Sequence, residues 1–349
     1  MAILFVLPLV LLSGTARAGE RLPPLNADIT QTSVSGISSG GAMAVQFHVA
    51  YSSLVKGAGV LAGVPFACAG NSASKAVRNC MQPDSSHPVP PLNELVSLTD
   101  QLVGSGAIDA TTYLAGDRVW LFSGTNDAIV KRPVMDRLYQ YYQYYIPTRH
   151  ISYEKAIKAG HAMIVSGEGS PCSYNGKPFI NDCQYDAAGF LLTQVYGSLK
   201  PRGAPLSGSV IEYDQREFFG TGDHAAYVHS MSDSGFAYIP APCSTRPCRV
   251  HVAFHGCKQN YEAVGDQFYT RSGFNEWADA NDLIVLYPQT IARYGWNWRE
   301  FWTLKYIVNP EACWDWWGYD TPNYYTQHGP QTRSIKSMLD RLASPRPTR

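Results

Sequence analysis

The chain is poor in charge, lacks any run of basic residues, and has only one long apolar segment. Charged residues make up 16% of its 349 residues, while hydrophobic residues make up 45%, so a disordered chain is excluded. Basic and acidic residues number 28 each, which gives a formal net charge of +0. Without a basic patch in the sequence, nucleic acid is not expected as a partner.

Two short motifs are also missing. No Cys-x-x-Cys pair occurs, and this disfavours a structural zinc site. No Asn-x-Ser/Thr sequon occurs either, so N-glycosylation is not expected. No metal is expected, and we expect a monomer.

The single apolar run lies at the start of the chain. Residues 3–12 are apolar apart from one proline, and Ala16-Arg17-Ala18 fits the small-x-small pattern of signal-peptide cleavage. The run is shorter than the roughly 20 residues that a membrane span needs. An uncleaved anchor or a buried N-terminal strand is the alternative, because no Lys or Arg precedes the run. We expect residues 1–18 to be a signal peptide and the mature chain to be secreted, extracellular and without a membrane span.

Secretion gives meaning to the even number of cysteines. Eight cysteines allow 105 pairings, and an oxidising compartment favours disulfides over free thiols. Three pairs are close neighbours in sequence, and joining them leaves two cysteines for a fourth bond. The expected disulfides are Cys68–Cys80, Cys172–Cys183, Cys243–Cys248 and Cys257–Cys313.

Segments with strand and helix patterns alternate along the chain, which predicts an α/β fold with a mostly parallel sheet and helices on both faces. Residues 71–91 are polar and contain prolines, so they are expected to form a disulfide-pinned loop. No repeat or low-complexity linker divides the sequence, and we expect one catalytic domain over residues 19–349. The strands are expected at residues 29–36, 60–62, 118–122, 150–155, 235–239, 249–254 and 283–287. The helices are expected at 39–51, 92–102, 134–145, 186–196, 274–280 and 331–342.

A Gly-x-Ser-x-Gly motif stands at residues 36–40, between the first predicted strand and the first predicted helix. This context is typical of the sharp turn that exposes a nucleophilic serine, where only glycine leaves enough space on either side. A glycine-rich turn without a catalytic role is the alternative. The motif predicts Ser38 as a nucleophile.

A serine nucleophile needs a histidine base and an orienting carboxylate, which follow it in the order Ser, Asp or Glu, His in α/β-hydrolases. Asp127 comes after the predicted strand 118–122, whereas Asp117 precedes that strand and Asp136 lies in a helix. The alternative for Asp127 is an ordinary turn aspartate.

The histidine should follow the next strand. His161 does so, whereas His150 begins that strand and therefore lies at the wrong end of it. Because ligands bind at the carboxyl edge of such sheets, Ser38, Asp127 and His161 are predicted to meet there.

The oxyanion hole indicates an unusual chain order. One donor is expected from the amide of Ser39, and the other normally comes from a loop that precedes the nucleophile. Too few residues precede Ser38 to hold that loop, yet His255-Gly256-Cys257 follows a later strand and fits it. This order predicts a circular permutation, with the front half of the fold placed behind the back half. The alternative is that His255 is a core histidine at a strand end.

These motifs, taken in order, resemble the fungal-type poly(3-hydroxybutyrate) depolymerases. The resemblance rests on GISSGG at 36–41, SGTND at 123–127, AGH at 159–161, HGC at 255–257 and NPEACWDWWGY at 309–319. It implies a circularly permuted α/β-hydrolase fold of the single-domain type, without the linker and separate polymer-binding domain of many bacterial relatives. It also implies a cofactor-free hydrolysis of short-chain polyhydroxyalkanoate esters.

Carried over position by position, the resemblance assigns Ser38, Asp127 and His161 as the triad. It assigns the Ser39 and Cys257 amides as the oxyanion hole, with a disulfide between Cys257 and Cys313. Trp314 matches a substrate-contacting tryptophan, and Asn309 is a further substrate-binding match.

The expected activity is therefore a two-step acyl transfer on a polyester or oligoester. Two other functions stay open from the sequence. One is a secreted carboxylesterase for soluble or plant-derived esters, similar to feruloyl esterases, and the other is a non-enzymatic binding protein on the same scaffold.

Overall fold

An eight-stranded sheet runs through the structure, which is a computed structural model that describes residues 19–203, 205–220, 225–296 and 306–347. The predicted signal peptide, residues 1–18, lies outside the described residues. The strands of the sheet are β1 (Asp28–Ile37), β2 (Val55–Leu61), β3 (Arg118–Phe122), β4 (Ile151–Glu154), β8 (Ser209–Asp214), β9 (Ser234–Ile239), β10 (Arg249–Phe254) and β11 (Leu283–Tyr287).

The strand order across this sheet is β4-β3-β2-β1-β10-β11-β9-β8. Adjacent strands from β4 to β11 pair in parallel, and β9 is antiparallel to both of its neighbours. The sheet is therefore mostly parallel, as predicted from the sequence.

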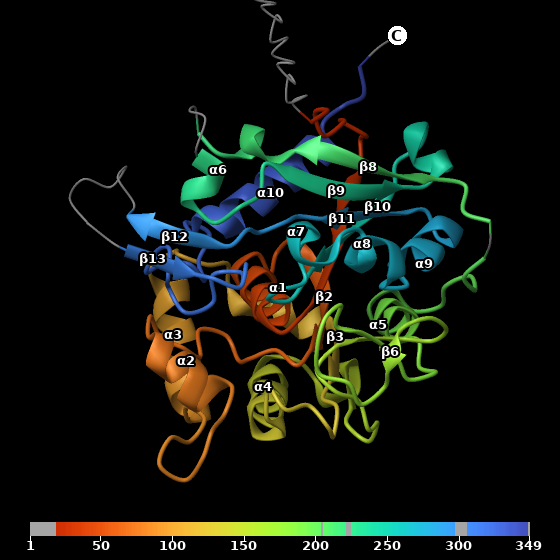
Figure 1. The fold of residues 1–349 in the computed structure, drawn as a ribbon. Helices are drawn as coiled ribbons and strands as arrows, with labels where there is room; N and C mark the ends of the chain where they lie inside the picture. Colours follow the sequence, from red (N-terminus) through yellow and green to blue (C-terminus); the bar gives the residue numbers. More distant parts are fainter. Residues whose placement is uncertain (1–18, 204, 221–224, 297–305, 348–349) are drawn as a thin grey trace, which may run out of the picture.

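Helices cover both faces of the sheet (Figure 1). One face packs against α1 (Ser39–Ala50), α3 (Leu92–Gly104), α4 (Arg132–Tyr145) and α10 (Pro330–Ala343), and the other against α5 (Ala187–Tyr196), α8 (Gln267–Arg271) and α9 (Phe274–Ala280). Along β3, Val119 and Leu121 enter the first core, while Trp120 and Phe122 enter the second. Two buried faces explain why these strands are nearly continuous apolar runs.

Smaller elements surround the sheet, and one of them is the helix α2 (Ala73–Cys80). This helix corrects the expectation that residues 71–91 form a loop. Its N-cap Ser72 accepts a hydrogen bond from the Lys75 N–H, and Cys80 at its end is disulfide-bonded. Only Ala76 and Cys80 of this helix are buried, and most of its other residues are polar.

The other small elements are α6 (Ala225–Val228), α7 (Tyr261–Val264), β5 (Met163–Val165), β6 (Ser170–Pro171), β7 (Ile180–Asp182), β12 (Arg293–Trp296), β13 (Tyr306–Asn309) and the 3-10 helices η1 (Thr111–Gly116), η2 (Thr148–His150), η3 (Gln215–Phe218) and η4 (Ala241–Ser244).

The topology is that of a circularly permuted α/β-hydrolase. Strands β1 to β4 form one half of the sheet, and β8 to β11 form the other, with β1 and β10 meeting in the middle. In the usual order, the strand that leads to the oxyanion loop precedes the nucleophile strand, but here β10 follows β1 in sequence. The Leu25 N–H donates to the Leu342 carbonyl, so the start of the described chain adjoins the end of α10, as a permuted fold requires.

No helix within the described residues is both long and apolar enough to cross a membrane.

Candidate active site

Ser38 lies on the turn between β1 and α1 with φ 57° and ψ −122°, a backbone conformation that non-glycine residues rarely adopt. The flanking glycines allow this turn to form. A Cβ on Gly36 would overlap the Gly40 carbonyl oxygen, and a Cβ on Gly40 would overlap the His255 carbonyl oxygen. The motif glycines are therefore required by close backbone contacts, and the strained turn lifts Ser38 above the end of the sheet.

Asp127 and His161 form a buried hydrogen-bonded pair beside this turn. His161 Nδ1 lies 2.9 Å from Asp127 Oδ2, and their side chains are 3% and 6% exposed, the aspartate being the more buried. The other oxygen, Asp127 Oδ1, accepts the N–H groups of Ile129 and Val130 at 2.8 and 2.9 Å. The carboxylate is thereby fixed on both sides and orients the imidazole.

Asn175 joins the loops that carry this pair. Its Oδ1 accepts the His161 N–H at 2.7 Å and the Ala128 N–H at 3.2 Å. Its Nδ2 donates to the carbonyls of Asn126 and Ser173, both at 3.1 Å. One exposed side chain therefore sets the spacing between the aspartate turn and the histidine loop.

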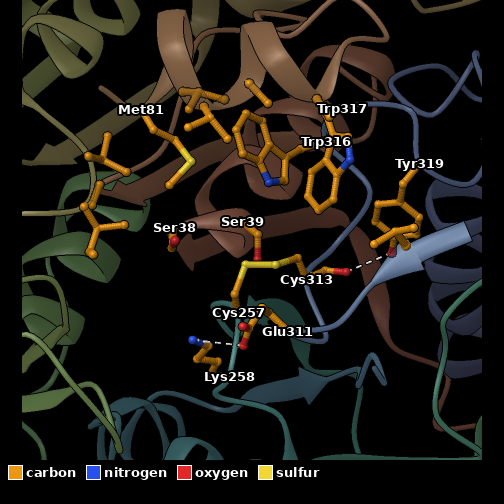
Figure 2. A pocket seen from close by; sticks show the side chains of 18 of the residues that line it. Ser38, Ser39, Met81, Cys257, Lys258, Glu311, Cys313, Trp316, Trp317 and Tyr319 are labelled. Atoms are coloured by element: carbon orange, nitrogen blue, oxygen red, sulfur yellow. Dashed lines mark hydrogen bonds and ion pairs between the residues drawn. A yellow bond between two sulfur atoms is a disulfide. The ribbon is translucent and has the colours of Figure 1, made fainter. Parts of the chain in front are cut away.

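A cavity of about 610 Å³ opens beside the nucleophile, and Ser38 and His161 both line it. Figure 2 shows Ser38 and Ser39 facing this cavity, with Trp316 and Trp317 on its far wall. Among the described residues, no hydrogen bond joins Ser38 Oγ to His161. This is common in unliganded enzymes, because catalytic hydrogen bonds often form only when substrate is bound. The structure thus brings Ser38 and His161 to one pocket, and Asp127 is held beside them by its hydrogen bond to His161 Nδ1.

The two predicted oxyanion donors lie at the same pocket. Ser39 is the first residue of α1, and Cys257 follows β10. Within the described residues, no hydrogen bond uses the backbone N–H of either one. The neighbouring Lys258 N–H is occupied, since it donates to the Glu311 carbonyl at 2.7 Å. Two unoccupied N–H groups beside a serine are what an oxyanion hole requires.

His255 is a buried histidine that shapes this loop. The Thr290 N–H donates to Nε2 at 3.1 Å, which leaves the ring proton on Nδ1, where it donates to the Gly256 carbonyl at 2.7 Å. Burial lowers the pKa of the imidazole to about 4, so the ring is neutral at pH 7. The side chain of His255 is therefore a core histidine, which was the alternative to a catalytic loop. Its backbone nevertheless leads into the predicted oxyanion loop at Gly256 and Cys257.

Trp314 and Asn309 lie away from the pocket surface, which corrects the expectation that they contact substrate. Both side chains are 0% exposed. Trp314 Nε1 donates to the His255 carbonyl at 3.0 Å, and Asn309 binds the backbone of Cys313 through both its amide atoms. Each therefore supports the oxyanion loop from behind.

Among the described residues, the tryptophans that line the pocket are Trp316 and Trp317. They lie in a turn held by Asp315, whose two carboxylate oxygens accept the backbone N–H groups of residues 318–321. Burial, reinforced by the nearby Asp320, raises the pKa of the Asp315 carboxyl to about 7. The buried carboxyl group fixes the aromatic wall relative to Ser38.

Four disulfides are present, and they join the pairs expected from the sequence. Two of them contribute directly to the pocket. Cys68–Cys80 fastens α2, whose Ala73, Ala76 and Val77 line the cavity, and Cys257–Cys313 ties the oxyanion loop to the tryptophan turn. Within the described residues, no cluster of three or more potential metal ligands occurs.

The chain is similar to two polyhydroxybutyrate depolymerases. It is 43% identical over 337 residues to a poly(3-hydroxybutyrate) depolymerase of Delftia acidovorans, covering 95% of this chain and 63% of that protein. It is 33% identical over 343 residues to a polyhydroxybutyrate depolymerase of Talaromyces funiculosus, covering 96% of each chain. The chain belongs to the polyhydroxybutyrate depolymerase family. No family model matches the chain.

Solved structures from this family have the same fold. The crystal structure of the Penicillium funiculosum PHB depolymerase superposes with a TM-score of 0.81 at 32% identity, covering 93% of this chain and 98% of that one. A PHB depolymerase complexed with an R3HB trimer gives the same score, identity and coverage. The family membership and the fold predicted from the sequence motifs are thereby confirmed.

Other parts of the site carry little signal in the sequence. The α2 wall lies in a polar segment. The aromatic stretch at residues 314–317 does not indicate which of its tryptophans line a cleft and which fill a core. Asn175 lies in a Tyr-Asn-Gly turn inside the Cys172–Cys183 loop, a pattern that predicts a turn but no partner.

Proposed function

We propose that this chain is a secreted serine esterase that hydrolyses ester bonds of poly(3-hydroxybutyrate) or of related short-chain polyesters and their oligomers. The observation that carries the proposal is the constellation at one cavity: Ser38 on a strained turn, the His161–Asp127 pair, and two unoccupied backbone N–H groups. Family membership supplies the substrate class, since the relatives are polyhydroxybutyrate depolymerases.

The mechanism has two acyl-transfer steps. His161 takes the proton of the Ser38 hydroxyl as Ser38 Oγ attacks the ester carbonyl, and Asp127 stabilises the imidazolium that forms. The amides of Ser39 and Cys257 bind the negative oxygen of the tetrahedral intermediate. The imidazolium then protonates the leaving alcohol as the ester bond breaks. His161 then deprotonates a water that attacks the acyl-enzyme, and the imidazolium returns that proton to Ser38 Oγ as the carboxylic acid leaves.

The pocket suits an apolar ester chain. Its lining includes the apolar side chains of Val64, Met81, Val130, Trp316 and Trp317. A Lys258–Glu311 ion pair, with Nζ and Oε2 3.0 Å apart, lies at the pocket and balances its charge. A chain of short hydroxyacid units, which carries no charge between its ends, matches such a lining.

We also propose that residues 19–349 act as one catalytic domain, as a monomer, after removal of residues 1–18. Four disulfides support an oxidising destination outside the cytosol. The size of the secreted protein, measured by mass spectrometry and gel filtration, tests both the cleavage point and the monomeric state.

The deciding experiment measures soluble 3-hydroxybutyrate released from a polymer suspension by the wild type and by Ser38→Ala. Release that vanishes in Ser38→Ala supports both the nucleophile and the polyester substrate. Ser53→Ala, an exposed serine at the far end of α1, is a matched control and is expected to keep full activity. Hydrolysis of a short soluble ester without release from polymer would replace the depolymerase proposal with a soluble-substrate carboxylesterase.

A further inference from the structure

Gln259 connects the two sides of the active site, although none of its side-chain hydrogen bonds goes to Ser38 or His161. Its side chain is buried, at 1% exposure, and every polar atom in it is used. Oε1 accepts the Gly256 N–H at 2.9 Å. Nε2 donates to the carbonyls of Pro178 and Phe179 at 3.2 and 2.9 Å.

The first contact fixes the loop that carries the oxyanion donor. Gly256 directly precedes Cys257, and a Cβ on it would lie 3.4 Å from both Ser38 Cβ and Gln259 Oε1. The peptide before Cys257 is thus packed between the nucleophile and the glutamine amide. On the other flank of Cys257, the Lys258 N–H donates to the Glu311 carbonyl. Both neighbours of the Cys257 N–H are therefore anchored, one of them by Gln259.

The other contacts fix the histidine side. The Phe179 carbonyl accepts a second hydrogen bond, from the Met163 N–H at 2.8 Å, two residues after His161. The Phe179 ring lies edge-on to the His161 ring with centroids 6.4 Å apart, and it lines the cavity. The Gln259 amide therefore spans from the oxyanion loop to the segment that packs against the catalytic base.

We propose that Gln259 is a positioning residue that holds the Cys257 N–H in register with Ser38 and His161. This inference rests on the proposed esterase function. A misplaced oxyanion donor weakens binding of the transition state more than binding of the ester, so the loss belongs in kcat. Removing an oxyanion donor outright costs about 10²–10³ in rate. Losing one of the anchors of that donor is expected to cost about 10-fold in kcat, with KM within about 2-fold.

The matched control is Gln215, which makes the same pattern of hydrogen bonds away from the cavity. It is 0% exposed, its Nε2 donates to the Ser232 and Gln289 carbonyls, and its Oε1 accepts the Gln289 N–H. Gln259→Met and Gln215→Met remove equivalent bonds and keep the side-chain volume. Both are expected to lower the unfolding midpoint, and only Gln259→Met is expected to lower the kcat of the folded protein on a soluble short-chain ester.

Gln259→Glu supplies a readout that a purely structural role would not produce. The introduced carboxylate, when ionised, accepts the Gly256 N–H but repels the two carbonyls, whereas its protonated form donates to one of them. Since burial raises the pKa of a carboxyl group, the activity of this variant relative to wild type is expected to rise as the pH is lowered from 8 to 6. The deficit of Gln259→Met is expected to be independent of pH over the same range.

Three results would overturn the proposal: unchanged kcat in folded Gln259→Met, a change confined to KM, or an equal loss of kcat in Gln215→Met. If the wild type hydrolyses the soluble ester but releases no 3-hydroxybutyrate, only the proposed polyester substrate is wrong. The role of Gln259 can then still be measured with the soluble ester. A wild type that hydrolyses no ester would overturn both proposals.

Discussion

His161 Nδ1 and Asp127 Oδ2 lie 2.9 Å apart in a site that excludes nearly all solvent from both side chains. The geometry fixes the imidazole with Nδ1 toward the carboxylate, which leaves Nε2 as the atom that can take the proton of Ser38. The carboxylate is more than a counter-charge, because two backbone N–H groups fix its second oxygen and hence the direction of the ring.

Asp127→Asn is expected to lower kcat about 10⁴-fold, because an amide can hold the wrong tautomer of His161. The measurement is kcat on a soluble short-chain ester at pH 7. Asp136→Asn is the control, since Asp136 bonds to Tyr153 on the exposed side of α4. A residual activity within about 10-fold of wild type in Asp127→Asn would exclude Asp127 as the triad acid.

Asn175→Ala is expected to lower kcat about 10-fold, because it removes the acceptor that the His161 and Ala128 N–H groups share. The unfolding free energy should change by only about 1 kcal/mol, since these hydrogen bonds lie near solvent. Asn126→Ala is the control, because that side chain makes a single bond of 3.4 Å to the Lys158 carbonyl. Equal activities of the two variants would contradict this role.

Removal of the Cys257–Cys313 disulfide, by alanine at both positions, is expected to lower kcat about 10-fold. The bond joins the oxyanion loop to a segment 56 residues away, so its loss also frees a long loop in the unfolded chain and costs roughly 2–4 kcal/mol of stability. The Cys243–Cys248 bond closes a separation of only 5 residues away from the cavity. Its double alanine variant should lose stability without losing kcat, and a matching loss of kcat there would argue against a catalytic role for Cys257–Cys313.

Trp317→Ala and Trp314→Phe are expected to affect different kinetic constants. Trp317 lines the cavity, so its removal should raise KM for a 3-hydroxybutyrate oligomer about 10-fold and change kcat on a small ester less than about 2-fold. Trp314→Phe keeps a buried ring but loses the bond to the His255 carbonyl, so it should lower kcat instead. Steady-state kinetics on both substrates measure the split, and a KM effect in Trp314→Phe alone would reverse the assignment.

Acid should destabilise the fold through its neutral core histidines. Burial lowers the pKa of His251 to about 3, whereas an imidazole in the unfolded chain has a pKa near 6.5. Below pH 6.5 the unfolded state therefore binds a proton that the folded state does not, and the unfolding free energy falls by about 2 kcal/mol per such histidine between pH 6.5 and 5.

The measurement is guanidinium unfolding of wild type and His251→Gln at pH 7 and pH 5. In the wild type His251 bonds to the hydroxyls of Ser33 and Ser35, which a glutamine amide can also reach. The variant should lose less stability than wild type on acidification, and it should retain the share that comes from His255. An identical pH dependence in the two proteins would show that His251 is not the titrating group.

The sequence was sufficient for the parts of the site that depend on local pattern. Ser38, Asp127 and His161 each follow a strand of the parallel part of the sheet. Because the carboxyl ends of parallel strands meet at one edge, strand order alone brings these residues together. The permuted topology was also predictable. The Gly-x-Ser-x-Gly turn and the His255-Gly256-Cys257 segment each belong to a particular place in the fold, and their order in the sequence is reversed here.

The remainder depends on contacts between distant segments, which no local pattern specifies. Trp314, Trp316 and Trp317 are near neighbours in one aromatic stretch, and only the Asp315 turn decides which of them face the pocket. In the sequence Gln259 is an ordinary polar loop residue. Only the structure shows that its side chain donates to the carbonyl of Pro178, which is distant in sequence. The sequence predicts a loop where α2 forms, because only two residues of this helix are buried and the others are mostly polar.

The pairing of β1 with β10, in which Gly36 lies opposite Phe254, sets the time at which activity can begin. A ribosome completes the nucleophile turn early and makes Cys257 much later, so a half-finished chain carries Ser38 and the Ser39 amide without the second oxyanion donor. The central ladder also waits for distant residues, which makes folding slow relative to a fold built from local contacts. We therefore expect esterase activity to begin only after the segment that carries Cys257 has been made and β10 has paired with β1.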